Sequence, residues 1–176
     1  AADLSLHASD FRAAERTFQL LTQAAGRAGR GGLPGRVVIQ TYDPEHYSIQ
    51  AAAEQDYEAF YRSEIQVRRR LYFPPFCVMA VVGITGLADR AVYDYGVKCR
   101  TKLASLAANM GHPPNMEIFA LTRAGIPKIN DKYRWRIFLK APDTDTLVKL
   151  LHQFKLPGKN KHISGVVMDI SPGSLF

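Results

Sequence analysis

The stretch KYRWRIFLK, residues 132–140, alternates between two kinds of side chain. Successive side chains of a β-strand point to opposite faces, so a strand here would sort them into two sets. The apolar set, suited to a core, is Tyr133, Trp135, Ile137 and Leu139. The second set, cationic with one aromatic ring, is Lys132, Arg134, Arg136, Phe138 and Lys140. The pattern predicts a strand that packs its apolar face on helices and exposes the other face.

The segments around this strand complete an α+β pattern. Apolar runs predict further strands, and helical spacing of apolar residues predicts two helices. Before the strand at 132–140 we expect a strand over 77–84, a helix over 88–107 and a strand over 116–121. After it we expect a helix that begins at Pro142–Asp143 and a strand over 163–170. The order β-α-β-β-α-β is that of a ferredoxin-like fold, an antiparallel sheet with two helices on one face.

The part before this pattern is predicted to be mainly helical. Asp10 can cap a helix whose apolar residues recur at three- and four-residue spacing. Residues 36–41 are rich in β-formers and predict a short strand, and helix formers dominate from Asp43–Pro44 to Leu71. The Pro74–Pro75 pair then separates two expected domains, residues 1–75 and 76–176.

The charges are divided unevenly between these two domains. The chain of 176 residues has a formal net charge of +7, but residues 1–75 hold nine basic and nine acidic residues and cancel to zero. Residues 76–176 hold fourteen basic and seven acidic residues, which accounts for the whole excess. Such a surplus favours contact with a polyanion, although a basic surface that serves only solubility is the alternative.

The densest motif of the first domain is Q-x-x-G-R-x-G-R, formed by Gln23, Gly26, Arg27, Gly29 and Arg30. Guanidinium groups are planar, permanently charged forks that match phosphate oxygens, and glycines allow close approach of the backbone. An arginine facing a nucleoside triphosphate stabilises charge on the transferring phosphoryl group. The alternative is an arginine-rich helix end with a glycine cap.

These five residues resemble the last conserved motif of superfamily 2 helicases. Other segments of the sequence make the resemblance more specific. They are DLSLH (3–7), DFRAAER (10–16), YFPPF (72–76) and KYRWR (132–136). Together these segments resemble the primosomal protein N′ (PriA) family over nearly the whole chain. The resemblance implies the C-terminal part of an ATP-dependent 3′-to-5′ DNA helicase that recognises stalled replication forks and restarts replication.

The resemblance also implies roles, cofactors and partners. Residues 1–75 would be a remnant of a RecA-like helicase lobe. Only in the intact helicase would Arg27 and Arg30 act on the transferring phosphate and Gln23 sense or position nucleotide or water. ATP and Mg²⁺ would serve the intact protein, and zinc an upstream domain. The implied partners are forked or single-stranded DNA, single-stranded DNA-binding protein and other primosome proteins, in the cytoplasm and away from membranes.

The chain by itself lacks a sequence motif that an ATP-dependent helicase needs. It contains no G-x-x-x-x-G-K-[ST] phosphate-binding loop, so we expect the isolated chain to bind no cofactor and to be inactive as an ATPase. An incomplete lobe would also expose apolar surface and favour self-association. The alternative function is a non-enzymatic module that binds nucleic acid or primosome proteins.

Seven residues of the second domain are candidates for DNA contact. Phosphate contacts would supply affinity, and an aromatic ring could stack on an unpaired base. Two of the candidates lie on the segment 123–131, which is expected to form a loop before the strand. The candidates are Arg123, Lys128, Lys132, Arg134, Arg136, Phe138 and Lys140. The alternative is a solvated strand face, since exposed strands are often charged.

Overall fold

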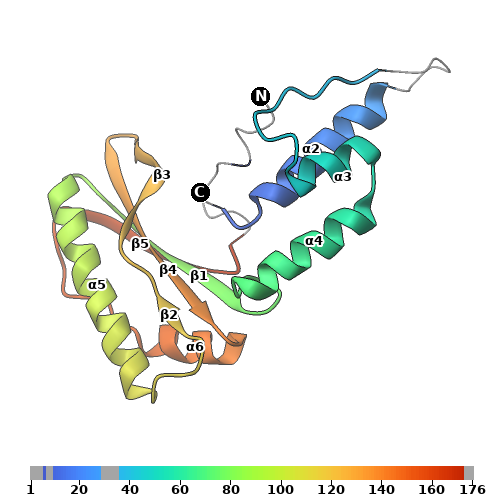
Figure 1. Ribbon diagram of the computed structural model, residues 1–176. Coiled ribbons are helices and arrows are strands. Elements are labelled where there is room, and N and C mark those ends of the chain that lie inside the picture. The colour runs from blue at the N-terminus through green and yellow to red at the C-terminus, as the bar shows by residue number, and fades with distance from the viewer. Residues whose placement is uncertain (1–5, 7–9, 29–35, 173–176) are drawn as a thin grey trace. The chain divides into compact units, whose positions relative to one another are not determined.

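The computed structural model describes Leu6, residues 10–28 and residues 36–172. The chain divides into two compact units, Ala1–Phe73 (unit 1) and Pro74–Phe176 (unit 2). Over the described residues it is an α+β protein with five helices and one five-stranded antiparallel sheet (Figure 1). Helices α2, α3 and α4 belong to unit 1, and the sheet with helices α5 and α6 belongs to unit 2.

Unit 1 is helical because its apolar residues recur at helical spacing. The helices are α2 (Ala13–Ala28), α3 (Tyr47–Glu54) and α4 (Tyr57–Arg70). Their small core consists of Phe18, Ala51, Ala52 and Phe60, with the rings of Phe18 and Phe60 stacked 4.4 Å apart. Asp10 lies three residues before α2, and its carboxylate accepts a hydrogen bond from the backbone N–H of Arg12 at 3.1 Å in the turn that precedes the helix.

The break between α3 and α4 is set by two residues. Gln55 takes the left-handed conformation, with φ of 55°, and so ends α3. Asp56 then caps α4 by accepting a hydrogen bond from the backbone N–H of Ala59 at 2.9 Å. The helix-forming stretch up to Leu71 is therefore two helices joined by a tight corner.

The strand predicted over residues 36–41 does not form. This segment has no regular secondary structure, and Val38 is 80% exposed. A β-strand needs a neighbour to satisfy its backbone N–H and C=O groups, and no strand in the described part of unit 1 pairs with this segment. The prediction was wrong because β-propensity reports side-chain fit to a sheet, not the presence of that sheet.

Unit 2 contains all the strands of the described chain. Its elements in order are β1 (Val78–Gly86), α5 (Asp89–Asn109), β2 (Glu117–Ile118), β3 (Thr122–Ile129), β4 (Lys132–Ala141), α6 (Thr144–Gln153) and β5 (Ile163–Ile170). The strands lie in the order β2-β4-β1-β5, with β3 also paired to β4, and all pairings are antiparallel. The predicted central strand, now β1, has neighbours on both sides.

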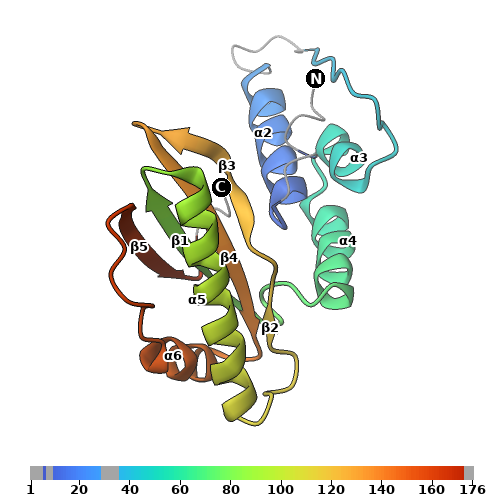
Figure 2. The same cartoon turned by 90° about the vertical axis from the view of Figure 1, so that its left-hand side faces the viewer.

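Helices α5 and α6 pack on the same face of this sheet (Figure 2). The alternation predicted for β4 is confirmed there, because Ile137 and Leu139 are fully buried and Tyr133 and Trp135 pack against the same cluster. The buried cluster joins both helices to β1 and β4 through Ala80, Val82, Ile84, Val92, Tyr95, Cys99, Leu103, Ala107, Ile137, Leu139, Ala141, Leu147, Leu150 and Phe154.

The segment 123–131, expected to be a loop, forms most of a β-hairpin instead. Strand β3 pairs with β4, and the turn between them has positive φ at both Asn130 (49°) and Asp131 (60°). Two such residues make the tight hairpin turn whose twist matches that of the strands. The register of β3 shifts between Arg123 and Lys128, so its pairing with β4 is irregular around Gly125 and Pro127.

Candidate functional site

The described part of the Q-x-x-G-R-x-G-R motif lies at the end of α2. Gln23, Gly26 and Arg27 are exposed in the last turns of this helix, while Gly29 and Arg30 lie outside the described residues. The helix continues past Gly26 to Ala28, so Gly26 is not its cap. Gln23 and Arg27 are four residues apart and share one helix face. Arg27 also complements the negative end of the helix dipole.

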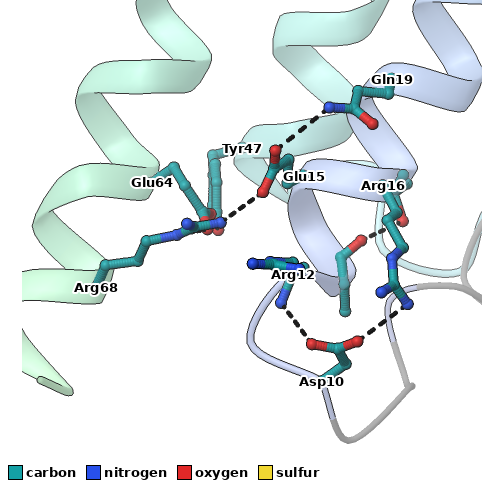
Figure 3. A network of polar contacts seen from close by, with 10 residues as sticks. Asp10, Arg12, Glu15, Arg16, Gln19, Tyr47, Glu64 and Arg68 are labelled. Carbon is teal, nitrogen blue, oxygen red and sulfur yellow. Dashed lines mark hydrogen bonds and ion pairs between the residues drawn. The ribbon is translucent and has the colours of Figure 1, made fainter. Parts of the chain in front are cut away.

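A partly buried polar cluster joins α2 to α3 and α4 (Figure 3). The Nε of Arg68 donates to Oε1 of Glu64 at 2.6 Å, and its Nη2 donates to Oε2 of Glu15 at 2.8 Å. The hydroxyl of Tyr47 donates to the other oxygen of Glu64 at 2.5 Å. We call these four residues, Glu15, Tyr47, Glu64 and Arg68, the Arg68 cluster. It holds the motif-bearing helix α2 against α4.

Two members of the Arg68 cluster, Arg68 and Glu64, are well shielded from water. The side chains of Arg68 and Glu64 are 14% and 8% exposed, and the guanidinium carbon of Arg68 lies 5.2 Å from the ring centre of Phe11. Burial by itself lowers the pKa of Arg68, but its bonds to Glu64 and Glu15 outweigh burial and raise that pKa. Burial, followed by the hydrogen bond to Glu64, raises the pKa of Tyr47. The guanidinium therefore stays charged and the phenol neutral.

A second ion pair anchors the beginning of α2. The carboxylate of Asp10, whose side chain is fully buried, pairs with Arg16 at 3.0 Å (Figure 3). Along the same helix, Gln19 donates to the free oxygen of Glu15 at 3.3 Å. The contact to Arg68 is thus made from the first turn of α2, while the motif residues Gln23 and Arg27 lie in its last turns.

The second candidate site is the sheet face of unit 2 that points away from its two helices. Cross-strand pairing places Phe138, Arg136 and Arg134 of β4 beside Val81, Gly83 and Thr85 of β1. The same residues of β1 are paired on their other side with Asp169, Val167 and Gly165 of β5. We call this set of nine residues the open face, and all of them are partly or fully exposed. It presents two guanidinium groups and one aromatic ring in adjacent rows.

Two causes lower the pKa of Arg136 on the open face. Burial lowers the pKa of Arg136, and the positive charge of Arg134 lowers it further. Like charges at this spacing repel, so an anion placed over both would be attracted to both. Lys132 is exposed at the start of the same strand. This arrangement can hold phosphate oxygens.

The other sequence-predicted cations do not join this surface. Arg123 is paired across the hairpin with Trp135, lies 5.3 Å from its ring centre and forms an ion pair with Asp89 at 2.5 Å. Lys128 is paired with Tyr133 and forms an ion pair with Asp131 at 2.9 Å. Residues directly opposite in an antiparallel pair share a face. Arg123 and Lys128 therefore lie on the face of Tyr133 and Trp135.

The expected exposure of Lys140 is also wrong. This residue is 6% exposed, and its Nζ lies 5.4 Å from the ring centre of Phe119. Its neighbour across the strands, Met79, is 4% exposed. Alternation predicted the correct side of the strand, but this end of the sheet is covered, so Lys140 is not an exposed phosphate contact.

The Arg68 cluster was not predicted as a unit from the sequence. The ion pair between Glu64 and Arg68 follows from their four-residue spacing, but the link from Arg68 to Glu15 spans 53 residues. The available signal was that Glu64 falls on the apolar face of its helix. A buried carboxylate in such a position requires a partner.

No group of three or more His, Cys, Asp or Glu side chains among the described residues is arranged to hold a metal ion. No described helix is long and apolar enough to cross a membrane.

Comparisons with known proteins bear on both units. A family model described as the Primosomal protein N C-terminal domain matches residues 69–172. The "Replication restart protein PriA" of Bacillus subtilis is 38% identical over 175 residues, which cover 97% of this chain and 21% of that relative. Proteins of the same name from Synechocystis sp. and Treponema pallidum are 37% identical over 155 residues and 35% identical over 153 residues. These alignments cover 88% and 87% of this chain and 18% and 22% of the two relatives.

The chain thus spans about a fifth of the length of these relatives. The family match lies over the end of α4 and unit 2, while the relatives also align with unit 1. The chain belongs to the Primosomal protein N C-terminal domain family and corresponds to the C-terminal region of replication restart protein PriA.

Proposed function

We propose that the chain is the DNA-contacting C-terminal part of an ATP-dependent helicase that acts at stalled replication forks. Unit 1 would complete the second motor lobe, and unit 2 would bind single-stranded or forked DNA. The observation that supports DNA binding most directly is the open face, where Arg134, Arg136 and Phe138 lie together while both helices occupy the opposite side. Its rows of cations and one aromatic ring match the two features that single-stranded nucleic acid offers, phosphates and bases.

Unit 2 is further proposed to be a ferredoxin-like domain. If β2 and β3 are taken as one edge, its elements follow the order β-α-β-β-α-β. The sheet order, from that edge through β4 and β1 to β5, supports this classification. Domains of this topology leave one sheet face uncovered, which is the face that DNA would use.

The proposed role of unit 1 rests on the motif at the end of α2. ATP and Mg²⁺ would be held largely by parts of the protein outside this chain, as would the zinc implied upstream. Exposed Gln23 and Arg27 suit contact with a nucleotide, because an exposed guanidinium can reach phosphate oxygens. Arg30 is proposed to act with Arg27.

A salt titration tests DNA binding by the open face. The double variant Arg134→Ala/Arg136→Ala should bind labelled single-stranded DNA more weakly, because two phosphate contacts are lost. The slope of log affinity against log salt should fall in magnitude by about 1.4, at about 0.7 for each phosphate contact on a single strand. Fluorescence anisotropy across ionic strength measures both quantities.

The matched control is Arg90→Ala, since Arg90 is highly exposed on α5, away from the open face. This variant should keep the wild-type slope to within experimental error. A double variant with unchanged affinity and slope would refute DNA binding by the open face. Equal losses in the double variant and the control would show a general charge effect instead.

A second candidate function is binding of a primosome protein, and one feature favours it. A hollow of about 320 Å³ lies between α6 and β5, lined by Val148, Leu151, His152, Met168 and Ile170. Strand β5 pairs only with β1 among the described strands, so its other edge can accept an extended peptide. Single-stranded DNA-binding protein and other primosome proteins are the proposed partners. Capture of such a protein that survives Arg134→Ala/Arg136→Ala but not Met168→Asp would support this function.

A further inference from the structure

Gly83 occupies the middle of the central strand β1, and the fold does not explain it. Glycine in a strand interior has an entropic cost and leaves nothing to pack, so it usually marks a special backbone geometry or a close approach. Its φ is not in the positive range. A Cβ built on Gly83 would have only the backbone oxygen of Val167 within 4 Å, at 3.9 Å, which is ordinary contact.

Gly86, three residues along the same strand, is a glycine for which a side chain has no room. A Cβ there would approach the backbone oxygen of His162 to 2.2 Å and a methyl group of Val92 to 2.7 Å. Packing therefore requires glycine at position 86. At position 83 a larger side chain fits, and the space that it would fill is empty in the protein alone.

This space is a hollow in the open face. Gly83 is paired with Arg136 on β4 and with Val167 on β5. The hollow measures about 300 Å³ and is lined by Val81, Gly83, Ile84, Thr85, Arg134, Trp135, Arg136, Val167 and Asp169. Strand spacings place its side walls about 10 Å apart across β4 and β5 and its ends about 13 Å apart along β1. That opening admits one flat aromatic ring system.

We propose that this hollow binds one unpaired base of single-stranded DNA, an inference that rests on DNA binding by the open face. The backbone at Gly83 forms a flat floor, and Val81 and Val167 supply apolar contact to the base. Arg134 and Arg136 hold the neighbouring phosphates, and the Asp169 carboxylate accepts a hydrogen bond from an N–H group of the base edge. A duplex cannot place a base there, because its bases remain stacked between two backbones, yet its phosphates still reach the arginines.

Filling the hollow with Gly83→Val tests this proposal in the 176-residue chain. The probes are a labelled oligothymidylate and a blunt duplex of equal length, and fluorescence anisotropy measures binding to each. Because the base would lose its place on the floor of the hollow, affinity for oligothymidylate should fall about tenfold, which corresponds to about 1.4 kcal/mol. Affinity for the duplex should stay within about twofold, and Gly83→Ala should give a smaller loss for the single strand.

Thermal unfolding separates a filled site from a damaged fold. Valine suits a strand better than glycine, so Gly83→Val should unfold at the same temperature as the wild type or higher. Gly158→Val, at a loop glycine with no atom within 4 Å of its Cβ position, is the matched control and should bind both probes normally.

The outcomes distinguish this proposal from the one on which it rests. Unchanged oligothymidylate binding by Gly83→Val overturns the base site, and so does an equal loss for both probes. If Arg134→Ala/Arg136→Ala nevertheless weakens both probes, DNA binding by the open face stands without the base site. If the double arginine variant has no effect either, both proposals fail.

Discussion

Arg68 shows how one side chain can organise unit 1. Its guanidinium is shared between Glu64, one turn earlier on the same helix, and Glu15, on the helix that carries the motif. Two carboxylates around one guanidinium leave a net negative charge. The hydrogen bond from the neutral Tyr47 hydroxyl stabilises that charge on Glu64. Such a shielded cluster depends on all of its members, because each balances the burial of the others.

Removing this guanidinium should destabilise unit 1. In Arg68→Ala the buried Glu64 loses its counter-charge, which costs about 3–5 kcal/mol of unfolding free energy for a broken buried pair. Hydrogen exchange of the backbone amides of α2 and α4 measures the loss within unit 1. Arg68→Lys should be intermediate, since an ammonium group keeps the charge but not the two-armed geometry.

The neighbouring variant Arg70→Ala is the control for this substitution. Arg70 is exposed in the last turn of the same helix, where its charge faces solvent, and we expect little change in amide protection. Protection in Arg68→Ala equal to that of the wild type would mean that the Arg68 cluster contributes nothing to holding α2 on α4.

At the scale of elements, caps and turns decide where helices and strands of unit 2 begin. Asp143 caps α6 by accepting a hydrogen bond from the backbone N–H of Thr146 at 2.7 Å. That backbone bond is the main cause of the lowered pKa of Asp143. At the tip of the β3–β4 hairpin, positive φ at Asn130 and Asp131 selects the turn and hence the register of β4.

The cap on α6 should make the stability of unit 2 depend on pH. The folded-state pKa of Asp143 lies below its ordinary value of 3.8, so the stabilisation is complete above about pH 3.8. It is lost as the pH falls through the lowered pKa, because the protonated carboxyl is a weaker acceptor. Asp143→Ala should lower the unfolding midpoint at pH 7 and reduce the acid-dependent part of the loss.

Asp143→Asn is the informative companion, because asparagine caps helices without a titrating group. It should keep most of the stability at pH 7 and flatten the acid limb of the midpoint curve. Thermal unfolding followed by circular dichroism between pH 2 and 7 records both effects. An acid limb of wild-type steepness in both variants would assign the pH dependence to other carboxylates.

At the scale of the whole chain, charge and composition separate two tasks. The excess of basic residues lies after Pro75, where the sheet is, while the glutamine, glycine and arginine motif lies in the charge-neutral part before it. No phosphate-binding loop is present in the sequence. In unit 1, Val38 and Tyr42 are 80% and 91% exposed.

We therefore expect the purified chain to bind forked DNA without hydrolysing ATP. A coupled assay with forked DNA should give no turnover above the background rate, while the same preparation binds labelled DNA in a salt-sensitive way. In the full-length relative, alanine at the position that aligns with Arg27 or Arg30 should abolish DNA-stimulated turnover and spare DNA binding. Turnover by the isolated chain would refute the assignment of this region to half of a nucleotide cleft.

Much of unit 2 could be predicted from local pattern alone. The period of two in residues 132–140 placed Ile137 and Leu139 in the core, and helical spacing placed Cys99 on a buried face, where burial raises its thiol pKa to about 11. Asp143 was identified as a cap by residue type. These predictions succeeded because each depends on neighbours within a few positions along the chain.

The failures concern partners that are distant in sequence. Residues 36–41 have the composition of a strand but no neighbouring strand in the described chain. Residues 123–131 were expected to form a loop, yet most of them pair with β4 in a register that places Arg123 and Lys128 opposite Trp135 and Tyr133. Lys140 is on the predicted side of its strand but at a covered end of the sheet.

The sequence by itself determined both helices of unit 2, its strands β1, β4 and β5, the two faces of β4, the charge difference between the halves and the family. Only the tertiary structure decided that Arg68 reaches Glu15, that Arg123 and Lys128 lie on the face of Trp135 and Tyr133, and that Gly83 lies between Arg136 and Val167. The physical reason is that backbone periodicity is encoded locally, whereas register and side-chain pairing follow from how distant segments satisfy their hydrogen bonds and bury their apolar surface together.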